Sequence, residues 1–168
     1  MRFTMTTGPA VRVVTGFVGV LLLGLLFLPG VLVQAHAPVG PVMAVPGLVG
    51  IVLLLTILWA PRAVRLEDER LVIERLLWPD LRIPLRDIAR VEAGPELHLA
   101  GGTVLRVAGN GGLMGFTGFF WVKGVGVVRM WATQLGTPTV LLRRHHARPI
   151  VLGADDAAGL LEALARRL

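Results

Sequence analysis

The chain has 168 residues, 54% of them hydrophobic, and a formal net charge of +6. Its mean hydropathy of +0.72 is high for a soluble protein. The absence of cysteine excludes disulfides, cysteine-based zinc sites and thiol nucleophiles. Serine and tyrosine are also absent and the only lysine is Lys123, so covalent catalysis would depend on threonine, Lys123, a carboxylate or histidine. This inventory disfavours an enzyme.

Two long apolar stretches occupy the first third of the chain, and no Asp, Glu, Lys or Arg occurs between Val13 and Pro61. Residues 13–33 and 43–60 would reach about 32 Å and about 27 Å as helices. Those lengths are adequate to cross a hydrocarbon core of ~30 Å. We therefore expect a two-helix transmembrane hairpin with a tight turn over residues 34–41.

The cations that flank this hairpin predict its orientation. Arg2 and Arg12 precede the first span, Arg62 and Arg65 follow the second, and the connecting turn has no cation. The positive-inside rule therefore places both termini in the cytoplasm, at the inner membrane. A cleaved signal peptide is disfavoured, because the apolar run is longer than the roughly 7–15 residues typical of such peptides.

The pattern changes after Ala60, which predicts a domain boundary. Residues 1–61 form an N-terminal tail and the hairpin, and residues 62–168 form a cytoplasmic domain. In the second part, short Val-, Ile- and Leu-rich runs alternate with Gly, Pro and Asn breaks, which is typical of a small antiparallel barrel or sandwich. A helix over residues 155–168 follows, with Asp155 as its expected N-cap. Its leucine face would cover one end of the barrel.

Three segments resemble the bacterial pleckstrin-homology-like family, and specifically a membrane-anchored member. They are "RIPLRDIARVE" at 82–92, "LRVAGNGGLMGFTGFFWVKGVGVVRMWAT" at 105–133, and "RPIVLGADDAAGLLEAL" at 148–164. The resemblance covers most of residues 62–168, and its glycine-rich block is the most specific part. It implies a mainly-β PH-like small barrel with a C-terminal capping α-helix. It implies the fold more firmly than an activity, because members mostly lack an assigned biochemical role.

The glycine-rich block at 109–126 does not match a phosphate-binding loop. A dinucleotide fingerprint would need glycine where Met114 stands, and a Walker A loop would need Ser or Thr after Lys123. We expect structural glycines that bend the sheet, at Gly112, Gly115 and Gly118. The aromatic residues of the block either fill the barrel core or contact the membrane interface, namely Phe116, Phe119, Phe120 and Trp121.

The densest basic cluster is "RRHHAR" at 143–148. Arg143, Arg144 and Arg148 are candidate contacts to an anionic surface, and the alternative is a solvated turn. A metal site at His145 and His146 is disfavoured, because neighbours on a strand point to opposite faces. Nucleic-acid binding is also disfavoured, because acidic and basic residues are interleaved.

These observations predict a non-catalytic membrane-tethered binding or scaffolding module at the cytoplasmic face of the bacterial membrane. The expected partners are the membrane, in which the chain would be integral, anionic lipid headgroups, and a protein partner or a homo-oligomer. We expect no catalytic residues, no cofactor, no metal and no nucleic acid. Two alternatives stay open: an accessory subunit or enzyme that acts on a membrane substrate, and a self-assembling membrane structural protein.

Overall fold

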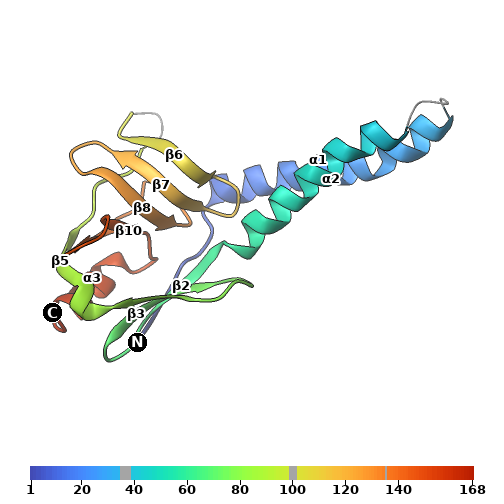
Figure 1. Cartoon of the computed structure of the whole chain (residues 1–168). Helices are drawn as coiled ribbons and strands as arrows, with labels where there is room; N and C mark the ends of the chain where they lie inside the picture. The colour runs from blue at the N-terminus through green and yellow to red at the C-terminus, as the bar shows by residue number, and fades with distance from the viewer. Residues whose placement is uncertain (35–38, 99–101, 135) are drawn as a thin grey trace.

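A computed structural model describes residues 1–34, 39–98, 102–134 and 136–168. In chain order (Figure 1), the elements are β1 (Arg2–Thr4), α1 (Pro9–Gln34), α2 (Val39–Leu58), β2 (Pro61–Leu66), β3 (Arg70–Arg75), β4 (Leu81–Pro84), the 3-10 turn η1 (Leu85–Asp87), β5 (Ile88–Ala93), β6 (Val104–Gly111), β7 (Phe116–Val122), β8 (Gly126–Ala132), β9 (Val140–Arg144), β10 (Ile150–Leu152) and α3 (Ala157–Ala165). The predicted mainly-β domain with a C-terminal helix is confirmed.

The strands form two sheets. The smaller sheet has the order β1-β2-β3-β4, and the larger has the order β5-β9-β10-β8-β7-β6. All neighbouring strands are antiparallel except β10 and β8, which run parallel. The first strand comes from the N-terminal tail, because Phe3 of β1 pairs with Val64 of β2. The tail therefore contributes directly to the β domain.

The core has two parts, because alternate residues of a strand point to opposite faces of its sheet. Trp131 of β8 lies in a cluster between the two sheets, together with Leu71 and Ile73 of β3 and Leu160 of α3. Its neighbour Met130 lies in a second cluster on the other face of the larger sheet. The larger sheet is therefore buried on both faces over much of its area.

The cap of α3 lies one residue later than the sequence predicts. The carboxylate of Asp156, rather than that of Asp155, accepts a hydrogen bond from the backbone N–H of Gly159. Asp155 instead bonds to the N-terminal segment. The sequence pattern located the helix but could not distinguish two adjacent aspartates.

Helices α1 and α2 form the expected hairpin, which projects from one side of the β domain (Figure 1). The prediction that they cross a membrane is wrong: among the described residues, no helix combines the length and the apolar character that crossing requires. The prediction counted apolar residues over 13–33 and 43–60, but α1 begins at Pro9 and its first turns pack on the β domain. Val11 is buried there, and the hydroxyl of Thr15 accepts a hydrogen bond from the N–H of Met114. Part of the predicted turn, residues 35–38, lies outside the described residues.

Candidate binding sites

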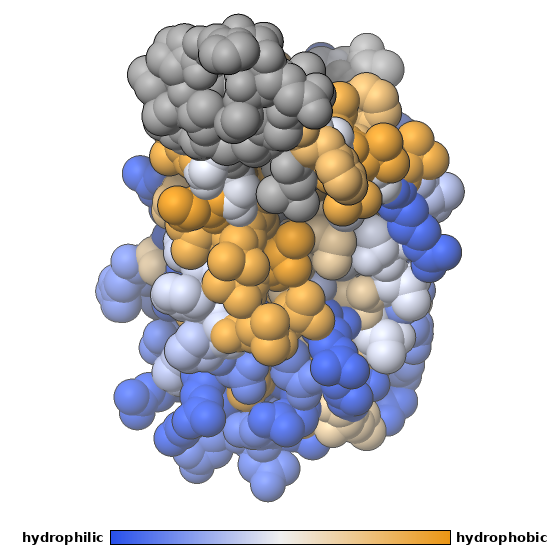
Figure 2. Space-filling model, turned by 90° about the vertical axis from the view of Figure 1, so that its right-hand side faces the viewer, coloured by the Kyte–Doolittle hydropathy of each residue, from blue (hydrophilic) through white to orange (hydrophobic). Residues whose placement is uncertain are grey.

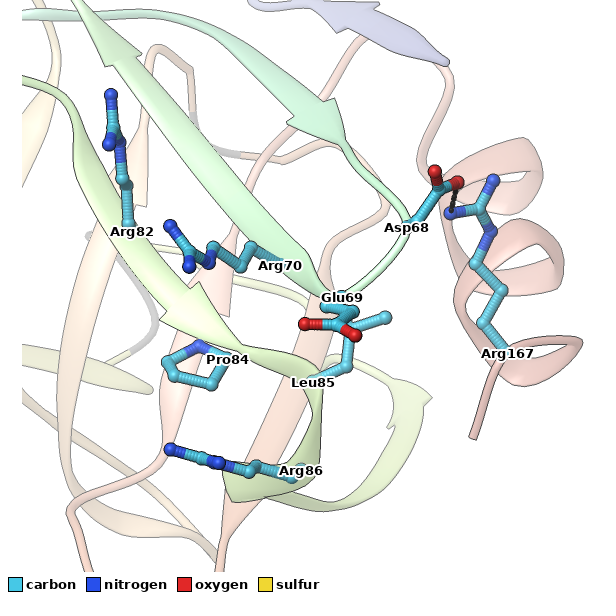
Figure 3. A pocket seen from close by; sticks show the side chains of 8 residues that line it. All are labelled: Asp68, Glu69, Arg70, Arg82, Pro84, Leu85, Arg86 and Arg167. Carbon is cyan, nitrogen blue, oxygen red and sulfur yellow. Dashed lines mark hydrogen bonds and ion pairs between the residues drawn. The ribbon is translucent and has the colours of Figure 1, made fainter.

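One pocket of the β domain has arginine at four of its eight lining positions (Figure 3). It has a volume of about 580 Å³ and is open to solvent. It lies where the β2–β3 loop, strand β4 and η1 meet, beside the C-terminal end of α3 (Figure 3). Its lining residues are Asp68, Glu69, Arg70, Arg82, Pro84, Leu85, Arg86 and Arg167. Four arginines and two carboxylates give this pocket, hereafter the arginine pocket, a positive character.

Strand pairing explains why Arg70 and Arg82 share one side of the pocket. Leu71 pairs with Ile83 on the inner face of the smaller sheet, so the flanking residues Arg70 and Arg82 lie on its outer face. Arg86 follows in η1, and Figure 3 shows all three side chains extending away from Arg167. Over the part of the chain that the structure describes, none of these three arginines forms an ion pair.

The opposite side of the arginine pocket is internally paired. A guanidinium N–H of Arg167 donates to the carbonyl of Glu67 at 2.7 Å, and the same nitrogen lies 3.4 Å from a carboxylate oxygen of Asp68 (Figure 3). This pairing anchors the end of the chain to the β2–β3 loop. It leaves the three arginines on the other side available to a ligand.

Strand β4 borders the arginine pocket and is an edge strand. It pairs with β3 on one side and ends the smaller sheet on the other. An edge strand presents backbone N–H and C=O groups that can pair with an added strand. The pocket therefore combines unpaired cations with a backbone edge.

A second candidate surface is apolar and lies on the side of the molecule from which the helices project. Trp59, after α2, and Trp78, in the β3–β4 turn, meet edge to face with ring centroids 6.0 Å apart. Leu77 beside them is 73% exposed, and α1 and α2 expose further large side chains, including Phe17 and Leu54. Figure 2 shows apolar surface over the upper and middle parts of this side and hydrophilic surface below it. We call this surface the apolar face.

The predicted basic cluster lies at the end of β9 and in the turn after it. Arg143 is paired with Glu92, and Arg144 is 3.5 Å from a carboxylate oxygen of Asp87. The guanidinium carbon of Arg148 lies 5.2 Å from the ring centroid of Phe119. Two of the three arginines therefore already have carboxylate partners, and the anionic-surface role of the cluster stays a prediction.

The four predicted aromatics divide between the core and the surface. Phe116 and Phe120 are buried in the second cluster and meet edge to face, with centroids 6.4 Å apart. Phe119 and Trp121 are 37% and 38% exposed, because they lie on the opposite face of β7. Membrane contact by the exposed pair stays a prediction.

Two of the three predicted structural glycines sit where a side chain would meet backbone. Gly112, Gly115 and Gly118 all have positive φ, at 121°, 130° and 129°. A Cβ on Gly115 would lie 2.7 Å from the carbonyl oxygen of Ala132, and a Cβ on Gly118 would collide with the carbonyl of Ala108. At Gly112 the space is open, so only the backbone conformation favours glycine there.

Sequence reasoning missed the arginine pocket although part of the signal was visible. Within "RIPLR", residues 82, 84 and 86 alternate with Ile83 and Leu85, so Arg82 and Arg86 are separated by an even number of positions. Arg70 is distant from them in the sequence, and only the pairing of β3 with β4 brings it beside Arg82. The signal was weaker than that of "RRHHAR", because the cations are dispersed along the chain.

Comparison with known proteins places most of the β domain in one family. A family model described as a bacterial PH domain matches residues 62–168, which is more than half of the chain. No curated protein matches the chain, and no solved structure does.

Proposed function

The chain belongs to the bacterial PH domain family, and we propose that it is a non-catalytic module that binds an acidic protein segment at the arginine pocket. The PH-like fold suggests a binding module. Because a fold hosts many functions, the fold alone does not identify the ligand, and the residues of the pocket must do so.

One observation carries the proposal: Arg70, Arg82 and Arg86 share one side of the pocket with no ion-pair partner among the described residues. Guanidinium groups bind carboxylates through paired, charge-assisted hydrogen bonds. A segment with several carboxylates would give each arginine such a partner. The pocket is open, so the segment can reach it without rearrangement of the fold.

The edge of β4 supports an extended conformation for this ligand. A segment that adds to a sheet edge gains main-chain hydrogen bonds, and its side chains point alternately to the two faces. Arg70 and Arg82 lie on the outer face. We therefore expect acidic residues at every second position of the bound segment.

We further propose that the apolar face rests on a membrane surface, at the cytoplasmic side of a bacterial membrane. Exposed Trp and Leu side chains are well suited to the headgroup boundary. The β2–β3 loop at the pocket and both termini lie away from the α1–α2 hairpin (Figure 1). A module held in this way would present the arginine pocket to the cell interior, where it could act as a scaffold.

Peptide binding to the full chain tests the proposed ligand. A short labelled peptide with glutamate at every second position is titrated with the chain and followed by fluorescence anisotropy. The matched peptide has glutamine at those positions. We expect binding about tenfold weaker for the glutamine peptide, since each tenfold change is about 1.4 kcal/mol and charged hydrogen bonds exceed that.

Two triple variants supply the decisive comparison. Arg70→Gln, Arg82→Gln and Arg86→Gln together should weaken binding of the glutamate peptide about tenfold. A control with the exposed Arg90, Arg106 and Arg166 changed to Gln removes the same charge elsewhere and should bind almost normally. Equal binding by the two variants would reject the pocket as the peptide site. Loss of binding to anionic vesicles, but not to the peptide, would identify a lipid headgroup as the ligand instead.

A further inference from the structure

The inner face of the larger sheet is covered at one end and open at the other. Strand pairing puts Phe119 opposite Arg129 and Trp121 opposite Val127, so these residues share a face with Trp131. Trp131 is only 2% exposed, whereas Phe119 and Trp121 are more than a third exposed. Arg129 therefore stands at the boundary between the buried core and the open part of the sheet.

Two arginines lie against aromatic rings at this boundary. The guanidinium carbon of Arg129 is 5.2 Å from the ring centroid of Trp131, and that of Arg148 is 5.2 Å from that of Phe119. Within the described ranges, neither arginine has a carboxylate oxygen within 4 Å. A guanidinium stacked on a ring can still donate hydrogen bonds from its edge. Both groups therefore retain donors for an anion.

Buried donors without acceptors occur at the same place. The indole N–H of Trp131 and the Nε of Arg144 are buried without hydrogen-bond partners. Buried polar groups in folded proteins are nearly always hydrogen-bonded, and both of these groups can only donate. Only an acceptor can satisfy either of these donors.

The local charge balance favours an anionic acceptor. Burial, and then the nearby charge of Arg144, lower the pKa of Arg129 below its ordinary value. Arg75, whose guanidinium carbon is 5.1 Å from the Trp131 ring centroid, adds a further cation, and its pKa is lowered by burial and then by Arg129. The carboxylates nearby are Asp87, at 3.5 Å from Arg144, and Asp80, which favours the charged form of Arg75. Among the described residues, the three arginines of this group thus outnumber the two carboxylates that act on them.

An apolar shelf continues from these arginines toward the sheet edge. Leu105 pairs with Trp121, which pairs with Val127, so the three side chains form one row across β6, β7 and β8. All three are at least a third exposed, and Phe119 lies beside them on the same face. A ligand that engages the arginines with an anionic group could place an apolar chain on this shelf.

We infer that the open end of this sheet face binds an amphipathic oxyanion, a single-chain molecule with a carboxylate or phosphate group at one end. Arg129 and Arg148 hold the oxyanion, and Arg144 contributes positive charge from the neighbouring β9. Phe119, Trp121 and Val127 cover the apolar chain. The site is separate from the arginine pocket, which lies on the outer face of the other sheet.

Titration of the full chain with small amphiphiles tests this inference. The probes are laurate and dodecyl phosphate, below their micelle concentrations, and the controls are uncharged dodecyl maltoside and inorganic phosphate. Calorimetry measures affinity. The change in tryptophan fluorescence on binding, compared between the wild type and Trp121→Phe, reports on Trp121, which is one of four tryptophans in the chain. We expect saturable binding of both charged amphiphiles, about tenfold tighter than that of either control. The laurate and phosphate arms show which oxyanion the site prefers.

Variants locate the binding. Arg129→Gln and Arg148→Gln should each weaken binding of the charged amphiphiles about tenfold, and Arg90→Gln, an exposed arginine of the same sheet, should leave it unchanged. If circular dichroism shows that Arg129→Gln is unfolded, the affinity of the Arg148→Gln variant is the test, because Arg148 is exposed. Equal affinity for charged and uncharged amphiphiles, or unchanged affinity in the folded arginine variants, would overturn the inference.

Discussion

The carboxylate of Asp155 holds Thr6, near the other end of the chain, through both the backbone and the side chain of that threonine. The N–H of Thr6 donates to Asp155 Oδ1 at 2.9 Å, and the Thr6 hydroxyl donates to the same oxygen at 2.8 Å. The hydroxyl of Thr4 donates to Oδ2 at 2.8 Å. This carboxylate therefore joins the segment after β1 to the loop before α3.

We expect these bonds to make stability depend on acid pH. Burial by itself raises the pKa of Asp155, but hydrogen bonds from Thr6 and Thr4 outweigh it and bring the pKa below its ordinary value. A carboxyl with a lowered folded-state pKa stabilises the fold above its unfolded pKa of about 3.9. That contribution is lost as pH falls through the folded-state pKa.

Urea unfolding of the wild type and Asp155→Asn between neutral and acid pH measures this effect. The wild type should lose stability more steeply than the variant below about pH 4. At neutral pH the variant should be less stable by about 1 kcal/mol, because the charged acceptor is replaced by a neutral one. Parallel pH curves for the two proteins would contradict the assignment.

The N-terminal segment should be required for a stable β domain. Met5 is 5% exposed in the core between the sheets, and the N–H of Met5 donates to the carbonyl of Arg62 at 3.0 Å. Met5→Ala should cost about 2 kcal/mol of unfolding free energy, because it leaves a cavity. Leu168→Ala, at a 53% exposed position, is the control and should change stability by less than about 0.5 kcal/mol. Similar losses in both variants, measured by urea unfolding, would refute the role of Met5.

Valine at Gly115 or Gly118 should destabilise the chain by about 3 kcal/mol each. Both positions combine positive φ with a carbonyl oxygen where Cβ would be placed. Gly124→Asn is the matched control, since its φ of 81° is accessible to asparagine and the surrounding space is open. Thermal unfolding compares the stability of the valine variants with that of the control. If Gly124→Asn is as unstable as the valine variants, steric collision is not the cause of their instability.

Vesicle binding should depend on the tip of the β3–β4 turn. The double variant Leu77→Asp and Trp78→Asp puts two charges on the apolar face. Each large apolar side chain contributes about 1.5–3 kcal/mol when it is buried. We therefore expect the co-sedimentation of this variant with vesicles to be at least about tenfold weaker. Val107→Asp with Leu168→Asp, at exposed positions elsewhere, is the control and should bind like the wild type. Undiminished binding of the Leu77/Trp78 variant would remove the apolar face from the proposal.

Local patterns in the sequence were sufficient for the order of the main elements. The short strands that begin after Ala60 and the leucine-rich helix near residue 160 fall where breaks and periodicity predict them. The resemblance to the bacterial PH domain family was visible for the same reason and is confirmed over residues 62–168. The membrane-spanning hairpin was wrong, because a count of apolar residues does not detect that the first turns of α1 pack on the β domain.

The sequence by itself thus determined the kinds and order of elements, since these depend on neighbours within a few positions. Only the tertiary structure decided which charges are paired, because the partners are far apart in the chain: Arg2 and Glu74 are separated by 72 positions, and Thr4 and Asp155 by 151. It also decided that Arg143 is engaged by Glu92 while Arg70, Arg82 and Arg86 collect around one pocket. Strand pairing sets such distances, and no local propensity encodes them.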